Sequence, residues 1–259
     1  MDKQKMSPAL IPAARNNNRQ VFPAFASPDT FHGTFTRRGG ISPSPFDSFN
    51  VAFGLADDDR NVRENRDRIK ASLGIKVLVS GRQVHGAKVA VIAEKPAADL
   101  EVEGCDALIT DTAGIGLMIQ HADCQAILLD DPVNRAVGIV HAGWRGSVAN
   151  IARKTVETMQ KTYGTDAVDL KAAISPSLGP CCAEFINYKQ ELPTAFLKYQ
   201  IRPNHFDFWA ISRDQLCRAG IRSDNIAVAS QCTVCNPEYF SYRRDRITGR
   251  CASVIGIRG

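Results

Sequence analysis

Two histidines and one cysteine are the residues of this 259-residue chain best suited to chemistry. His85 lies in the sequence QVHG, Cys124 in HADCQ and His141 in VHAGWRG. Two imidazoles and a thiolate form a ligand set of borderline softness, which suits Zn²⁺. Three protein ligands leave one metal position open, and an open position distinguishes a catalytic zinc from a structural one. The pattern therefore predicts an enzyme in which these three residues bind the metal and take part in catalysis.

The sequence around His141 adds a candidate anion site. His141 ends an apolar run of strand length and leads directly into Ala-Gly-Trp-Arg-Gly. A glycine-rich turn between a strand and a helix presents backbone N–H groups to an anion, and Arg145 adds a bidentate partner. The alternative is a tight turn in which Trp144 fills the core. We expect Arg145 to bind phosphate or a carboxylate.

Two neighbours of Cys124 are further candidates for the site. Asp123 is predicted to orient a ligand or to transfer protons. If the strand before it continues, alternation places His121 and Asp123 on one face and Cys124 on the other. We therefore interpret His121 as a core residue or a support for the ligands. If His121 were a fourth ligand, it would close the open position.

The remaining cysteines carry a weaker pattern. Cys232-x-x-Cys235 could indicate a second zinc site, but no second pair follows at zinc-finger spacing. Cys181 and Cys182 are adjacent and point in different directions in any regular element, so we do not expect both to serve one site. We expect these four cysteines and Cys251 to be structural thiols.

Composition limits the function classes. Lys+Arg 32 against Asp+Glu 27 gives a net charge of +5, which favours anionic small molecules and does not indicate nucleic acid. No run of 18 apolar residues is present, so no membrane span is expected. The first residues lack the apolar segment of a signal peptide. A cytoplasmic location, with reduced thiols, is therefore expected.

The spacing of apolar residues predicts a single α+β domain. Residues 1–29 lack periodicity and are predicted to be a poorly ordered N-terminal extension, and residues 30–259 form the domain. Helices are predicted over residues 61–73, 148–163, 188–199 and 211–219. Strands are predicted from residue 30 and over residues 76–80, 88–92, 115–120, 126–130, 136–141, 170–175, 226–229 and 252–257. Because strands and helices do not alternate strictly, mixed sheets are favoured.

Together these segments resemble the laccase-domain family, also called multicopper polyphenol oxidase-like or purine nucleoside phosphorylase proteins. The resemblance covers residues 31–257 and is carried in order by HGTFTRRGGIS, PFDSFN, VRENR, QVHG, CDALIT, ADC, VHAGWRG, PSLGPCC, CTVCN and YFSYRRDRITGR. It implies a four-layer α/β/β/α fold and a zinc or copper ion on His85, Cys124 and His141. We expect Arg145, Arg37 and Asn50 to bind the substrate or its phosphate.

The resemblance also implies an activity. Family members are described as phosphorylases of adenosine, inosine and methylthioadenosine with an adenosine deaminase side activity. Some are described as copper-dependent phenol oxidases, and one bacterial branch as peptidoglycan-editing factors. Five histidines cannot supply a multicopper oxidase, because a blue-copper site alone takes two of them. We therefore expect one metal site, a purine nucleoside and phosphate as partners, and neither nucleic acid nor membrane.

Three other functions fit the same residues. A single copper ion on the two histidines and the cysteine could give a copper-dependent phenol oxidase with weak activity. Cys124 could act as the nucleophile and His141 as the base of a metal-independent cysteine hydrolase. Alternatively, a fourth ligand, Cys235 or His121, would turn the cluster into a structural zinc site of a non-enzymatic partner-binding protein.

Overall fold

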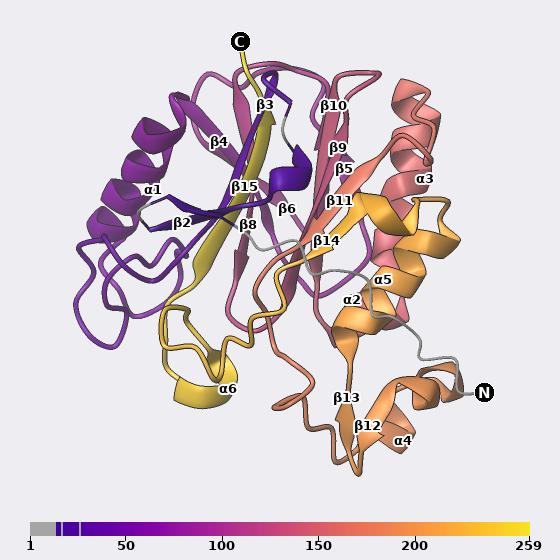
Figure 1. Cartoon of the computed structure of the whole chain (residues 1–259). Coiled ribbons are helices and arrows are strands. Elements are labelled where there is room, and N and C mark those ends of the chain that lie inside the picture. Colours follow the sequence, from indigo (N-terminus) through magenta and orange to yellow (C-terminus); the bar gives the residue numbers. More distant parts are fainter. Residues whose placement is uncertain (1–13, 17, 26) are drawn as a thin grey trace.

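Two mixed β-sheets lie face to face, and helices cover both outer faces (Figure 1). The computed structural model describes residues 14–16, 18–25 and 27–259. The larger sheet has seven strands and carries α1 (Asp59–Leu73) on its outer face. The smaller sheet has six strands and carries α3 (Ile151–Tyr163) and α5 (Phe208–Arg218). The predicted α+β class, with α/β/β/α layers in a single domain, is confirmed.

The larger sheet is antiparallel around its long strand β15 and parallel where β4 pairs with β6 and β8. In spatial order its strands are β1 (Ala14–Asn16), β2 (Arg19–Val21), β3 (Thr30–Phe35), β15 (Cys251–Ile257), β8 (Ile115–His121), β4 (Val77–Arg82) and β6 (Leu100–Glu103).

The smaller sheet is antiparallel in its middle and parallel at both edges. In spatial order its strands are β14 (Ile226–Val228), β11 (Lys171–Ile174), β9 (Gln125–Asp131), β10 (Ala136–Ala142), β7 (Ala107–Thr110) and β5 (Val89–Val91). A separate two-stranded ribbon is formed by β12 (Gln200–Arg202) and β13 (His205–Phe206).

Short helices occupy the connections between these elements. They are α2 (Trp144–Val148), α4 (Tyr188–Glu191), α6 (Tyr242–Asp245) and the 3-10 helices η1 (Pro23–Phe25), η2 (Thr194–Tyr199) and η3 (Ser223–Asn225). Within the described part of the chain, no helix is long and apolar enough to cross a membrane.

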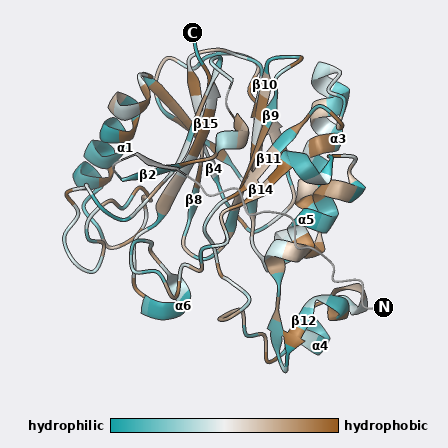
Figure 2. Cartoon of the chain, viewed as in Figure 1, coloured by the Kyte–Doolittle hydropathy of each residue, from teal (hydrophilic) through white to brown (hydrophobic). Residues whose placement is uncertain are grey.

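Apolar side chains fill the space between the sheets. One cluster joins Leu117 and Ile255 of the larger sheet to Leu128 and Ile139 of the smaller sheet. Every residue of β9 and β10 is buried, because one face meets the other sheet and the opposite face meets helices. Figure 2 shows the hydrophobic residues gathered on these inner strands, whereas α1 is coloured mainly hydrophilic. The two sheets therefore form a rigid frame for the loops at their edges.

Local signals explain where the sequence-based prediction of helices holds. The helix predicted over residues 61–73 is confirmed within α1, where Asp58 caps the first turn and Gly74 ends the last turn at φ 70°. The helix predicted over residues 188–199 is instead divided into α4 and η2, because Pro193 lacks the N–H that a continuous helix requires. The pattern does not predict β6 and β7, since each has only four residues.

The segment before residue 30 is more ordered than the sequence predicts. Its described part forms β1, β2 and η1, and β2 pairs with β3 at the edge of the larger sheet. Phe22 and Phe25 are buried in the cluster between the sheets. The prediction of a poorly ordered extension does not hold for residues 18–25, whose structure comes from this pairing rather than from local periodicity. Residues 1–13 lie outside the described residues.

Candidate metal centre

The structure brings the three predicted ligands together. One donor atom from each of His85, Cys124 and His141 lies within 4.8 Å of the other two. The rings of His85 and His141 meet edge to face, with their centroids 4.9 Å apart. His141 is 3% exposed, Cys124 is half-buried and His85 is exposed. Their positions meet the spatial requirement of a shared site, and metal binding by them stays a prediction.

Connections between the two sheets position these ligands. The loop from β4 in the larger sheet to β5 in the smaller sheet carries His85. The turn of residues 122–124, from β8 to β9, makes the same crossing and carries Cys124. His141 lies near the end of β10, opposite Ala126 of β9. Two connections between the sheets and the end of β10 thus meet at one edge of the two sheets.

Asp106 organises both histidines. Its carboxylate accepts hydrogen bonds from the backbone N–H groups of Val84, His85 and Gly86 at 3.2, 2.9 and 2.8 Å. These bonds hold His85 in the left-handed region at φ 59°. Oδ1 of Asp106 also accepts a hydrogen bond from Nδ1 of His141 at 2.8 Å. A proton held at Nδ1 leaves Nε2 as the nitrogen of His141 that can bind a metal.

Charge stabilises a thiolate at the centre of the cluster. Burial by itself raises the pKa of the Cys124 thiol, but His141 and His85 outweigh burial and lower the pKa to about 6. Burial likewise lowers the pKa of His141, but Cys124 and Asp106 outweigh it and raise the pKa to about 9. At neutral pH Cys124 is therefore a thiolate, the form of cysteine that binds metals and attacks electrophiles.

The surroundings of the cluster fit one small ion. Gly143 faces the ligands, and a Cβ at this position would lie 2.9 Å from Sγ of Cys124 and 3.2 Å from Cδ2 of His85. The glycine therefore keeps open the space beside the sulfur of Cys124 and the ring of His85. A carboxylate behind one ring nitrogen, as Asp106 lies behind His141, is also the usual support of a metal-binding histidine, which binds through its other nitrogen. The residues present thus fit a metal of the zinc or copper type.

The other histidines have partners elsewhere. Nε2 of His32 accepts a hydrogen bond from the backbone N–H of Phe22 at 2.8 Å, and Nδ1 of His205 bonds to a backbone carbonyl at 2.9 Å. His121 lines the cavity described below, but it is 2% exposed and bonds through Nε2 to Ser253 at 2.8 Å. Its interpretation as a core residue is confirmed. Only two histidines therefore meet at the cluster, as expected for one metal site rather than a multicopper set.

Asp123 has a structural position beside Cys124. Its carboxylate accepts hydrogen bonds from Oγ1 of Thr233 and Oγ of Ser241, both at 2.7 Å, and from the backbone N–H of Arg243 at 2.6 Å. Its backbone is in the left-handed region at φ 91°. Three donors thus hold Asp123 in this conformation. Its roles in orienting a ligand and in transferring protons stay predictions.

A cavity of about 780 Å³ opens onto the cluster. One part of its lining is aromatic and comes from Phe53, Trp144, Phe185, Phe208 and Tyr242. Another part is cationic and comes from Arg82, Arg243, Arg246 and Arg250. The carboxylate of Glu101 also lines the cavity and accepts hydrogen bonds from Arg66 and Gln120 at 2.7 and 3.2 Å. The cavity therefore combines apolar walls, cations and a fixed carboxylate around the metal ligands.

Three residues predicted to bind substrate or phosphate lie outside the cavity lining. Arg145 is exposed and stacks on its own neighbour Trp144, 4.4 Å from the ring centroid. Arg37 forms an ion pair with Asp47 at 3.2 Å. Asn50 is fully buried and bonds to Asp57 at 2.9 Å. The structure gives these residues other partners. Three of the cations that line the cavity, Arg243, Arg246 and Arg250, come from the segment around α6, and Arg82 comes from β4.

The structure also changes the interpretation of four cysteines. The prediction that Cys181 and Cys182 cannot serve one site is wrong, because their sulfur atoms gather with those of Cys232 and Cys235. The two residues lie in an irregular loop, where the rule for regular elements does not apply.

Comparisons with known proteins identify the family. The model of the family described as multi-copper polyphenol oxidoreductase laccase matches residues 31–258, and the chain belongs to this family. Purine nucleoside phosphorylase YlmD of Geobacillus stearothermophilus is 33% identical over 245 residues, covering 87% of this chain and 89% of that protein. A purine nucleoside phosphorylase of Deinococcus radiodurans is 36% identical over 238 residues, covering 87% and 88%.

A solved structure agrees with this assignment. The crystal structure of YlmD from Geobacillus stearothermophilus matches with a TM-score of 0.86 and 32% sequence identity, covering 97% of this chain and 100% of that chain. The resemblance predicted from the sequence motifs is therefore confirmed, and the relatives' names point to purine nucleosides and phosphate as the substrate class to consider.

Proposed function

We propose that this chain is a metal-dependent purine nucleoside phosphorylase that cleaves adenosine, inosine and methylthioadenosine with phosphate. The proposal is carried by the cavity of about 780 Å³, in which the metal ligands, aromatic walls and cations share one space. The names of the relatives support the substrate class. Deamination of adenosine, in which oxygen from water replaces the 6-amino group, is proposed as a side activity. The proposed setting is the cytoplasm, where the Cys124 thiol stays reduced.

The proposed metal is Zn²⁺, with copper as the alternative, and it would be held by His85, Cys124 and His141. When bound, such an ion acts as a Lewis acid toward a substrate oxygen or nitrogen atom. Asp106 keeps the proton at Nδ1 of His141 and so presents Nε2 to the ion. Gly143 leaves room beside Sγ of Cys124.

The residues of the cavity perform the binding steps of phosphorolysis. In this reaction a phosphate oxygen bonds to C1′ of the ribose while the bond from C1′ to the purine nitrogen breaks. Arg246 and Arg250 attract the phosphate anion to the cavity, and charge-assisted hydrogen bonds from guanidinium groups hold it. Phe185 and Tyr242 offer flat apolar surfaces to the purine. Glu101, fixed by its donors, accepts a hydrogen bond from a ribose hydroxyl.

The test is an assay of inosine cleavage with and without phosphate. The purified protein is expected to release hypoxanthine and ribose 1-phosphate only when phosphate is present. The His141→Ala variant is expected to lose this activity, because it removes a ligand and the partner of Asp106. His205→Ala, which changes a histidine on the β12–β13 ribbon, is the matched control. Equal ribose 1-phosphate release by the wild type and by His141→Ala contradicts the proposal.

A cysteine hydrolase is the second candidate, and one observation favours it. The carboxylate of Asp106 orients His141, and His141 lowers the pKa of the Cys124 thiol to about 6. A nucleophile, a base and a residue that orients the base are the three parts of an activated cysteine. In this alternative, Cys124 attacks an acyl carbon and His141 gives its proton to the leaving group.

Chelation separates the two candidates. For a phosphorylase that requires metal, dialysis against a chelator abolishes turnover and added zinc restores it. For a cysteine hydrolase, turnover survives chelation and is abolished by iodoacetamide in the metal-stripped protein. The same preparation of wild-type protein serves for both treatments.

A further inference from the structure

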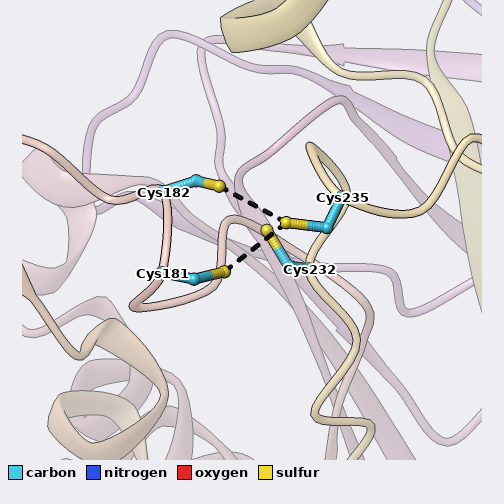
Figure 3. Close-up of side chains that lie close together, drawn as sticks. All are labelled: Cys181, Cys182, Cys232 and Cys235. Atoms are coloured by element: carbon cyan, nitrogen blue, oxygen red, sulfur yellow. Dashed lines mark hydrogen bonds between the residues drawn. The ribbon is translucent and has the colours of Figure 1, made fainter.

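Four cysteines form a cluster that shares no residue with the candidate metal centre (Figure 3). Cys181 and Cys182 lie in the loop between β11 and α4, and Cys232 and Cys235 lie between β14 and α6. The four sulfur atoms all lie within 4.8 Å of one another. We propose that these four thiolates hold a structural Zn²⁺ ion, a second metal site that fastens the two loops together.

The spacing of the sulfur atoms matches a tetrahedral ligand set. Sγ of Cys235 lies 3.5 Å from Sγ of Cys182 and 3.7 Å from Sγ of Cys181. Zinc binds thiolates at about 2.3 Å, which places the sulfurs of a tetrahedron about 3.8 Å apart. A disulfide requires about 2.0 Å, and all four cysteines are free. The cluster is therefore arranged for one ion with four sulfur ligands.

The backbone holds the two loops side by side at this point. The N–H of Ser177 donates to the carbonyl of Gln231 at 3.1 Å, and the N–H of Thr233 donates to the carbonyl of Ser177 at 3.0 Å. The N–H of Gly179 donates to Sγ of Cys232 at 3.3 Å, a bond that stabilises a thiolate. A Cβ at Gly179 would lie 2.8 Å from Cβ of Cys232, so only glycine permits this approach.

Cationic side chains contact both loops. Four thiolates around Zn²⁺ carry a net charge of −2, which nearby cations stabilise. Nη2 of Arg202 donates to the carbonyl of Cys181, and Nη1 of Arg244 donates to the carbonyl of Thr233, both at 2.7 Å. Cys181 and Cys235 are exposed, so an ion can reach the cluster from solvent. Four protein ligands close the coordination sphere, which is the arrangement of a structural rather than a catalytic zinc.

The cluster connects to the candidate active site through Asp123. The N–H of Leu178, in the loop of Cys181, donates to the carbonyl of Asp123 at 2.8 Å. Oγ1 of Thr233, in the loop of Cys235, donates to the carboxylate of Asp123 at 2.7 Å. Both loops therefore hold the residue that precedes Cys124. The proposed zinc would act through this contact by positioning, without touching the substrate.

The zinc content of full-length variants tests the proposal. The Cys182→Ser/Cys235→Ser variant is expected to contain one zinc ion per chain fewer than the wild type, as measured by mass spectrometry of the metals. Cys217→Ser, at a half-buried cysteine outside both clusters, is the matched control and is expected to retain the wild-type content. Equal zinc in the double variant and the wild type overturns the proposal.

A second set of variants separates the two sites. His85→Ala/His141→Ala removes two predicted ligands of the candidate centre and leaves the four cysteines unchanged. Introducing Cys182→Ser/Cys235→Ser into this background is expected to remove one further zinc ion. The four-cysteine site is thereby tested whether or not the proposed phosphorylase activity is found.

Wild-type protein gives a readout that needs no variant to fold. After replacement of zinc with Co²⁺, a site with four thiolates is expected to show strong near-ultraviolet charge-transfer absorption, in excess of that of a site with one thiolate. Zinc is also expected to protect Cys181, Cys182, Cys232 and Cys235 from iodoacetamide until a chelator removes it. Equal alkylation of these cysteines before and after chelation, or disulfides among them in the purified protein, overturns the proposal.

Discussion

Asp106 and His141 are joined by two hydrogen bonds. Oδ1 of Asp106 accepts from Nδ1 of His141 at 2.8 Å, and the backbone carbonyl of Asp106 accepts from the N–H of His141 at 2.6 Å. The same carboxylate accepts the backbone N–H groups of the loop that carries His85. One side chain thus sets the position of two of the three predicted metal ligands, and the proton position of one of them.

Replacing Asp106 with asparagine tests this positioning role. The amide oxygen can still accept a hydrogen bond, but the negative charge that favours a proton at Nδ1 of His141 is lost. The zinc affinity of the candidate centre is expected to fall by about 10- to 100-fold, the usual effect of losing a carboxylate behind a histidine ligand. Competition with a chromogenic chelator measures the affinity.

The control for this experiment is Asp111→Asn, which changes an exposed carboxylate five residues away in the sequence. It is expected to retain the wild-type affinity. Unchanged affinity in Asp106→Asn would show that the backbone alone positions the histidines. Release of zinc from the four-cysteine cluster is recorded separately through the alkylation of Cys181 and Cys235.

Arg246 is expected to contribute to phosphate binding. It lines the cavity, whereas Arg145 stacks on Trp144 outside the lining. Hydrogen bonds to charged groups contribute about 1.5–3 kcal/mol, so Arg246→Gln should raise the KM for phosphate at least about tenfold. The KM for inosine should change less, because the purine contacts aromatic walls. Initial rates at varied phosphate concentration provide the measurement.

Arg145→Gln is the matched control for this prediction. It removes the same charge from a position that faces solvent, and its KM for phosphate is expected to remain within about twofold of the wild-type value. If the KM for phosphate rose strongly in Arg145→Gln and did not change in Arg246→Gln, the VHAGWRG turn rather than Arg246 would be the phosphate site.

The Cys124 thiolate has a measurable pH dependence. Because His141 and His85 lower its pKa to about 6 against the opposing effect of burial, the thiolate fraction of metal-stripped protein rises as the pH increases through this value. Iodoacetamide should therefore alkylate Cys124 at half its maximal rate near pH 6. In His141→Gln the midpoint should move upward, since the largest favourable charge is lost. If the pH midpoint of Cys124 alkylation were the same in the wild type and in His141→Gln, His141 would not be what lowers the pKa of the thiol.

The sequence predicts some of these features because their signals are local. The Asp58 cap, the apolar spacing of α1 and Gly74 lie within 17 residues of one another, so they define a helix without tertiary information. His85, Cys124 and His141 could be grouped because only a few residue types bind zinc. The four-layer arrangement itself was implied by the family motifs, since apolar runs alone do not give the order of strands.

Other features depend on contacts that the sequence does not reveal. Asp106 lies 35 residues before His141 and directly precedes a strand of only four residues, so nothing in its spacing indicates a partner. Cys182 and Cys235 are 53 residues apart, and their loops are joined by backbone bonds between irregular segments. Arg246 lines the cavity from the segment around α6, which Ser241 and Arg243 fasten to the carboxylate of Asp123. In each case tertiary contacts, rather than local pattern, bring the residues together.

His32 couples the segment before residue 30 to the frame, and this contact predicts a pH-dependent stability. Nε2 of His32 accepts the N–H of Phe22 at 2.8 Å, and the ring of Phe25 meets the imidazole edge to face at 4.9 Å. Burial, assisted by the charge of Arg19, lowers the pKa of His32 from 6.5 to about 4. Protonation of Nε2 would break its bond with Phe22.

The sign of the effect follows from this shift. Between pH 6.5 and about 4 the unfolded chain binds a proton at His32 and the folded chain does not, so stability falls as the pH decreases. The contribution of His32 is complete above pH 6.5, and its loss by pH 4 amounts to about 3 kcal/mol. Urea unfolding of the wild type and of His32→Gln, at pH values from 8 to 4, measures it. The free energy of unfolding of the wild type, relative to that of His32→Gln, should decrease by this amount as the pH falls from 8 to 4. If the two free energies changed with pH in parallel, His32 would have the same pKa in the folded and unfolded chains.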